Sequence, residues 1–154
     1  MNVQRLSHIG ICVSDLERSV AFYRDALGFA EISRLQLDGP EVARLLQLAN
    51  GALQAVYMQR DGTRIELLYY PQDGHHGGDA PAPMNRLGLT HLSLRVADLD
   101  AVVAAVRSLG GACLDATRID NDAWRSKAVF VIDPDGLRIE LLQAPGNPDA
   151  LPGA

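Results

Sequence analysis

The chain has 154 residues, of which 47% are hydrophobic and 21% charged, the composition of a globular protein. Its 14 basic and 19 acidic residues give a net charge of −5, which argues against a nucleic-acid partner held through its phosphates. No apolar run approaches the length of a membrane span, and residues 1–10 lack the apolar stretch of a signal peptide. With only Cys12 and Cys113 as thiols, we expect a cytoplasmic protein with no membrane contact.

The first half of the sequence predicts a strand, a helix and three further strands. Alternating residues from His8 to Val13 predict the first strand, and Ser14 with Glu17 has the capping-box pattern that begins a helix. Gly28 stands where that helix should end. The later strands are expected over 29–37, 52–59 and 63–70.

Segments rich in glycine and proline flank the second half. Residues 72–86, QDGHHGGDAPAPMNR, have the composition of a linker, and we interpret His75 and His76 within it as solvated loop residues. Residues 146–154 are expected to form a flexible tail.

The second half repeats the pattern of the first. HIGICVSDLERSVAFYRDALGF (8–29) aligns with HLSLRVADLDAVVAAVRSLGG (91–111), and GTRIELLYYP later in the first half aligns with GLRIELLQAP in the second. Asp98 is the candidate N-cap of the second helix, and Gly110 should end it. Strands are then expected over 112–117, 127–132 and 137–143. The chain is therefore predicted to be an α+β protein of two tandem modules, 3–71 and 87–145, joined by the linker 72–86.

Strand periodicity places four polar residues on matching faces of the two modules. Side chains alternate between the faces of a strand, and the apolar residues of the first strand should face the helix, so His8 points away from it. The same reasoning puts Glu66, His91 and Glu140 on the faces away from the helices. Because an unpaired carboxylate is costly to bury, the matching histidines and glutamates predict one divalent cation bound by all four. Two neighbouring positions of an octahedral cation would stay open for substrate.

The repeat resembles the vicinal oxygen chelate (VOC) superfamily, the group of glyoxalase I, methylmalonyl-CoA epimerase and the extradiol dioxygenases. The resemblance covers about residues 5–143 and is carried by HIGICVSDLERSVAFYRDALGF, RIELL, THLSLRVADLD and DPDGLRIELLQ. It implies a single domain over 1–145, in which paired βαβββ modules form a curled mixed sheet around a metal. It also implies that His8, Glu66, His91 and Glu140 are the ligands of one divalent ion per chain (Zn, Ni, Co, Mn or Fe).

The resemblance implies a lyase or isomerase of the glyoxalase I or epimerase type. Such an enzyme would remove a proton from a small carbonyl or thioester compound through a metal-stabilised enediolate or enolate. Glu140 is the first candidate for the base, and Glu66 is the second. An extradiol-type dioxygenase, with two histidines and one glutamate, would leave Glu66 unexplained. A non-catalytic small-molecule protein, as in antibiotic resistance, would not need all four ligands.

The same parity argument gives a candidate substrate pocket. Its lining would include Cys12, Tyr70, Ser93, Arg95 and Arg138. Bacterial glyoxalase I has an arginine where this chain has Cys12 and an asparagine where it has Tyr70, so glutathione and coenzyme A both stay open as the substrate's carrier. Arg138, two residues before Glu140, could hold a substrate anion.

The sheet edges of each module also predict the oligomeric state. Exposed edge strands and apolar surface favour pairing with a second copy, so we expect a homodimer.

Overall fold

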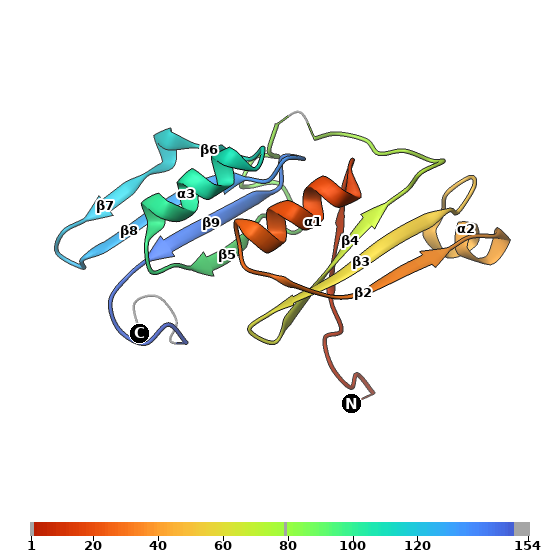
Figure 1. Ribbon diagram of the computed structural model, residues 1–154, viewed down its shortest axis with the longest axis horizontal. Coiled ribbons are helices and arrows are strands. Elements are labelled where there is room, and N and C mark those ends of the chain that lie inside the picture. The colour runs from red at the N-terminus through yellow and green to blue at the C-terminus, as the bar shows by residue number, and fades with distance from the viewer. Residues whose placement is uncertain (1, 79, 150–154) are drawn as a thin grey trace. The chain divides into compact units, whose positions relative to one another are not determined.

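The computed structural model describes residues 2–78 and 80–149, and the chain divides into two compact units, 1–76 and 77–154 (Figure 1). The first unit consists of β1 (Ile9–Cys12), α1 (Leu16–Asp25), β2 (Ala30–Leu37), α2 (Pro40–Leu46), β3 (Leu53–Arg60) and β4 (Thr63–Tyr69). Its sheet has the order β1-β4-β3-β2, with β1 parallel to β4 and the other pairs antiparallel.

The second unit repeats this plan without a counterpart of α2 and adds two short elements, a 3₁₀ helix and the strand that follows it. It consists of β5 (Leu92–Arg95), α3 (Leu99–Ser108), β6 (Ala112–Cys113), the 3₁₀ helix η1 (Asp115–Thr117), β7 (Ile119–Asn121), β8 (Ser126–Ile132) and β9 (Arg138–Gln143). Its sheet has the order β5-β9-β8-β6, and β7 also pairs with β8. Here β5 and β9 are the parallel pair. The predicted α+β fold of repeated strand–helix–strand modules is confirmed.

In each unit one long helix packs on the sheet, α1 in the first and α3 in the second (Figure 1). The core of each unit lies between its own helix and its own sheet. In the first unit Val20 and Tyr23 of α1 are buried, and so are Ile65 and Leu67 of β4. In the second unit Val103 and Val106 of α3 are buried, as are Ile139 and Leu141 of β9. The alternation inferred from the sequence therefore places the helix side of β4 and β9 correctly.

The strand that opens the second module is less covered than its sequence suggests. Leu92 and Leu94 are only half-buried. Val13, which follows β1 in the first unit, is buried by contrast. β5 is an edge strand, as β1 is in the first unit, so the edge position does not explain the difference.

The predicted capping box of the first helix is wrong. The N-cap is Asp15, whose Oδ1 accepts a hydrogen bond of 3.0 Å from the backbone N–H of Arg18. Ser14 instead accepts from the Arg18 guanidinium, and Glu17 forms an ion pair with Arg34 of β2. The expected cap at the matching place is confirmed, since Asp98 accepts from the backbone N–H of Ala101 at 3.0 Å.

Helix α2 was not expected from the sequence. It starts with Pro40, whose fixed φ suits the first turn, and none of its residues is buried. The loop after it packs tightly, because a Cβ on Gly51 would lie 2.3 Å from the backbone nitrogen of Ala43. The short helix is therefore held by the backbone of the following loop, a contact that periodicity cannot reveal.

The predicted strand 112–117 is correct only for Ala112 and Cys113, which form β6. Pairing with β8 stops after Cys113, and the chain turns into η1. The Thr117 hydroxyl donates to the Leu114 carbonyl at 2.7 Å and accepts from the Phe130 backbone N–H at 2.9 Å. These local hydrogen bonds replace part of the expected ladder, and β7 then resumes pairing with β8.

The predicted linker contains no helix or strand in its described part, 72–78 and 80–86. Asp73 accepts hydrogen bonds from the backbone N–H groups of Asn50 and Gly51, both at 3.1 Å. His75 and His76 are exposed. A flexible tail was predicted over residues 146–154, and the last five of these lie outside the described residues. Among the described residues, no helix is long and apolar enough to cross a membrane.

Candidate metal centre

The first histidine–glutamate pair lies at the parallel strands of the first unit. His8 stands just before β1, and Glu66 lies in the middle of β4. The register pairs Gly10 with Glu66, so the two strands bring His8 beside the carboxylate. His8 Nε2 lies 2.9 Å from Glu66 Oε2. The predicted sharing of a face by these two residues is thus realised as a direct contact.

Two neighbours orient the first pair. The Ser7 hydroxyl lies 3.1 Å from His8 Nδ1, and the Tyr57 ring meets the imidazole edge-on with centroids 5.3 Å apart. Tyr57 also lies opposite Glu66 in the register of β3 with β4. Hydrogen bonding to the Glu66 carboxylate, with burial and the carboxylate charge, raises the pKa of Tyr57 to about 12.

The second pair has the same construction in the second unit. His91 stands just before β5, Glu140 lies in β9, and His91 Nε2 is 3.7 Å from Glu140 Oε2. The Thr90 hydroxyl lies 2.9 Å from His91 Nδ1, and the Phe130 ring meets the imidazole edge-on at 5.3 Å. The Ser93 hydroxyl, opposite Glu140 in the register, donates to Glu140 Oε2 at 2.7 Å.

The donor set of each pair suits a divalent cation. In both histidines a hydroxyl contacts Nδ1, which leaves Nε2 directed at the carboxylate; an outer partner of this kind typically fixes a metal-binding imidazole. Imidazole nitrogen and carboxylate oxygen are common ligands of zinc and other transition metals. Across residues 2–78 and 80–149, no three His, Cys, Asp or Glu side chains gather closely enough to hold a cation.

The pocket residues expected in the first unit lie near its pair. Cys12, the last residue of β1, is exposed, and Tyr70 follows β4 and is half-buried. Burial, together with the charges of Cys12 and Glu66, raises the pKa of Tyr70.

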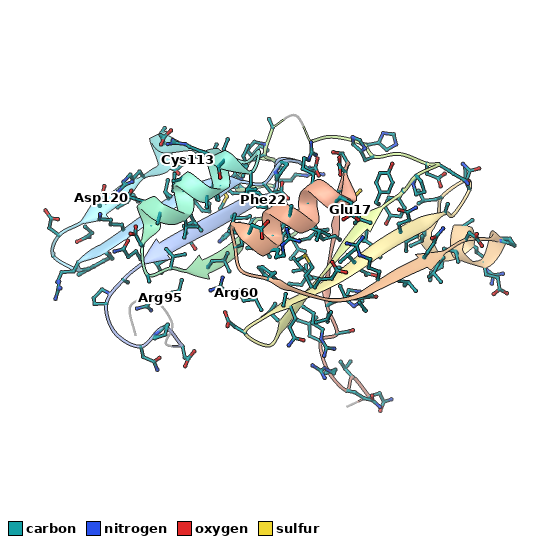
Figure 2. All side chains as sticks on the ribbon, in the orientation of Figure 1. Glu17, Phe22, Arg60, Arg95, Cys113 and Asp120 are labelled. Carbon is teal, nitrogen blue, oxygen red and sulfur yellow. The ribbon has the colours of Figure 1, made fainter. Side chains whose placement is uncertain are left out.

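The two predicted pocket arginines are engaged with backbone in the second unit. Arg95, labelled at the end of β5 in Figure 2, donates to the carbonyls of Ala144 at 3.0 Å and Pro145 at 2.5 Å. Arg138 donates to the Ala82 carbonyl at 2.7 Å. Its guanidinium also lies 5.7 Å from the centre of the Phe130 ring. A substrate anion would have to compete with these contacts, and the role of both arginines in binding stays a prediction.

The sequence reasoning missed the residues that support the ligands. They are Ser7, Tyr57, Thr90 and Phe130. One signal was available, because a hydroxyl residue precedes the histidine in both copies of the repeat, SHIG and THLS. The aromatic residues could be found only by aligning β3 with β8, whose registers place them opposite the two glutamates.

A strand–helix–strand unit that occurs twice, each copy carrying a histidine–glutamate pair, defines the fold class that the sequence suggested. Comparison with known protein families supports the same fold class. The chain matches the Glyoxalase/Bleomycin resistance protein/Dioxygenase superfamily over residues 5–141 and belongs to that superfamily.

Several relatives extend over nearly the whole chain. The uncharacterized protein YaeR of Escherichia coli (strain K12) is 32% identical, over 93% of this chain and 98% of its own length. Lactoylglutathione lyase of Haemophilus influenzae is 30% identical, over 90% of this chain and 92% of its own. The mitochondrial methylmalonyl-CoA epimerase of Mus musculus is 28% identical, over 91% of this chain and 73% of its own length.

Solved structures share the fold. A glyoxalase family protein from Bacillus cereus is similar with a TM-score of 0.80 at 20% identity, covering 95% of this chain and 97% of that one. The fosfomycin resistance protein FosX from Listeria monocytogenes, solved in complex with Mn(II) and sulfate, has a TM-score of 0.58 at 15% identity, with 93% and 94% covered. At these identities the likeness concerns the fold alone.

Proposed function

We propose that the protein is a metal-dependent lyase or isomerase that moves a proton on a small carbonyl or thioester compound. The observation that carries this proposal is the repeated histidine–glutamate pair, built with the same supporting contacts in both units. A structural ion pair would need no such duplication, nor a hydroxyl on each Nδ1.

In this proposal His8, Glu66, His91 and Glu140 together bind one divalent cation per chain. When bound, the cation would polarise neighbouring substrate oxygens and stabilise the negative charge that proton loss creates. Support comes from the donor chemistry of the pairs and from the fold shared with FosX, whose structure contains Mn(II). The ligands of one site could come from one chain or from two, and the choice among Zn, Ni, Co, Mn and Fe stays open.

Glu140 is the proposed base. Its side chain is 32% exposed, whereas that of Glu66 is 10% exposed, so substrate can approach Glu140 more readily. A carboxylate can accept a proton from the substrate carbon and return it to the same or an adjacent carbon. The Ser93 hydroxyl holds one carboxylate oxygen at 2.7 Å and leaves the other available.

The reaction class can be tested with the compounds named in two relatives. We expect the metal-loaded protein to exchange a carbon-bound hydrogen of methylmalonyl-CoA or lactoylglutathione for deuterium in D₂O, measured by proton NMR. Exchange that needs both protein and metal would support the proposal, and chelated protein is the control. Oxygen uptake with catechol would instead favour a dioxygenase. Tight binding without exchange would favour a binding or resistance protein. Either result would contradict the proposal.

We also propose that the protein is a homodimer that acts in the cytoplasm. Strand β2 is an edge strand exposed on both faces, with Ile32 48% and Leu37 40% exposed. An apolar edge of this kind is suited to burial against a second copy. Light scattering should give twice the mass of the chain, and a monomer mass at every concentration would contradict the dimer. The cytoplasmic location stays a prediction.

A further inference from the structure

The chain reaches His91 through an exposed strap of the second unit, residues 80–90. Each residue of the strap is described, and none of them is buried. Towards its end Leu87 is 98% exposed and Leu89 is 87% exposed. Segments with few buried contacts open easily, so the position of the strap depends on the contacts that anchor it.

Arg138 of β9 anchors the strap near its start. Its Nη1 donates to the Ala82 carbonyl at 2.7 Å and to Met84 Sδ at 3.1 Å. Hydrogen bonds from a charged guanidinium are stronger than neutral ones. The strap then turns, and the Arg86 backbone N–H donates to the Pro83 carbonyl at 3.0 Å. The guanidinium therefore holds the part of the strap from which this turn begins.

The same arginine is connected to His91 in two ways. Its guanidinium carbon lies 5.7 Å from the centre of the Phe130 ring, within the range of a cation–π contact. That ring meets the His91 imidazole edge-on, with centroids 5.3 Å apart. The strap ends at Thr90, whose hydroxyl lies 2.9 Å from His91 Nδ1. Arg138 thus supports both contacts that orient the imidazole.

The matching arginine of the first unit makes a different contact. The repeats GTRIELL and GLRIELL place Arg64 where Arg138 stands, two residues before the glutamate. Both arginines are half-buried, but Arg64 Nε donates to Gln59 Oε1 at 2.9 Å, on the neighbouring strand β3. The anchoring of a strap is therefore particular to Arg138.

We infer that Arg138 is a positioning residue that fixes the His91 imidazole, through Phe130 and through the strap, and that it is not the group that binds a substrate anion. The inference rests on the proposed function and deepens it, because it assigns this arginine to a metal ligand rather than to the substrate. An anion at Arg138 would displace the Ala82 carbonyl and release the strap.

The first measurement uses the metal-free full chain, so it depends on neither activity nor bound metal. Arg138→Met removes the guanidinium and keeps an apolar side chain of similar length. Without the anchor, the Arg86 amide should exchange with solvent about 10-fold faster, the effect of losing a hydrogen bond from a charged group. The ring-proton NMR signals of His91, identified as those missing from His91→Ala, should shift because the Phe130 ring is no longer held.

The matched control is Arg64→Met, the same substitution at the equivalent position of the repeat. It should leave the Arg86 amide and the His91 signals as they are in the wild type. Arg138→Lys separates charge from shape, because it keeps the positive charge but loses the planar guanidinium. Anion binding through charge predicts wild-type signals in Arg138→Lys, whereas positioning predicts a shift towards those of Arg138→Met. Circular dichroism checks that each variant is folded.

Co²⁺ binding, measured by competition with a chromophoric chelator, relates the strap to the proposed site. We expect Arg138→Met to weaken Co²⁺ binding about 10-fold, the lower end of the loss for an outer partner, because it acts on His91 through other groups. In a Thr90→Val background the further loss should be smaller, since one of the two connections is already cut.

Wild-type His91 signals and Arg86 exchange in both Arg138 variants, or the same changes in Arg64→Met, would overturn the inference and leave the proposed function intact. Unchanged Co²⁺ affinity with a raised KM for the exchanging substrate would do the same, because that is the pattern of an arginine that binds substrate. Failure of the wild type to bind Co²⁺ would overturn both.

Discussion

Glu140→Gln is expected to lower turnover by roughly 10²–10⁴-fold while most of the metal stays bound, as befits the loss of a positioned general base. The amide oxygen of glutamine can still act as a ligand, but the side chain cannot accept a proton. The Ser93 hydroxyl, which donates to Glu140 Oε2, can donate equally to an amide oxygen. The measurement is deuterium exchange into whichever of methylmalonyl-CoA and lactoylglutathione the wild type exchanges.

The control for this substitution is Glu17→Gln. Glu17 is an exposed glutamate of α1, paired with Arg34 and labelled in Figure 2, and it belongs to neither pair. Its substitution should leave the exchange rate unchanged. If Glu140→Gln exchanged deuterium as fast as the wild type, the base would have to be Glu66 or another group, and the task assigned to Glu140 would be wrong.

His91→Ala is expected to weaken divalent-metal binding by more than about 100-fold, beyond the loss that follows removal of an outer partner. Alanine removes the Nε2 donor and leaves the Glu140 carboxylate without its neighbour at 3.7 Å. His8→Ala should have an effect of the same order, because its Nε2 has the equivalent place at 2.9 Å from Glu66. Chelator competition with Co²⁺ or Zn²⁺ measures both.

His75→Ala is the matched control for these variants, since His75 is an exposed histidine of the linker outside both pairs. It should bind metal as the wild type does. Stoichiometric, tightly held metal in His91→Ala would remove His91 from the ligand set. A loss shared by His75→Ala would mean that the linker histidines take part in binding.

The alternation of side chains was enough to single out the four candidate residues in the sequence. It put His8, Glu66, His91 and Glu140 on the strand faces away from the helices, because a strand's faces follow from residue parity alone. The repeat then supplied the second pair once the first was recognised. Helices α1 and α3 were predictable from the repeat, since each copy carries its own periodic pattern.

Contacts between neighbouring strands were beyond that reasoning. Tyr57 and Phe130 meet the glutamates only through the registers of β3 with β4 and of β8 with β9, and parity does not fix a register. The role of Asp15 as the N-cap in place of Ser14 depends on backbone angles that both residues could adopt. The reach of Arg138 to the Ala82 carbonyl likewise depends on how the linker folds.

Titration of the metal-free protein with Co²⁺, followed by visible absorbance, tests the four-ligand site most directly. If both pairs serve one ion, the wild type saturates at one Co²⁺ per chain, and either His8→Ala or His91→Ala abolishes that step. Saturation at two Co²⁺ per chain, with each variant losing only one of them, would show that each pair binds its own ion and would contradict the shared site.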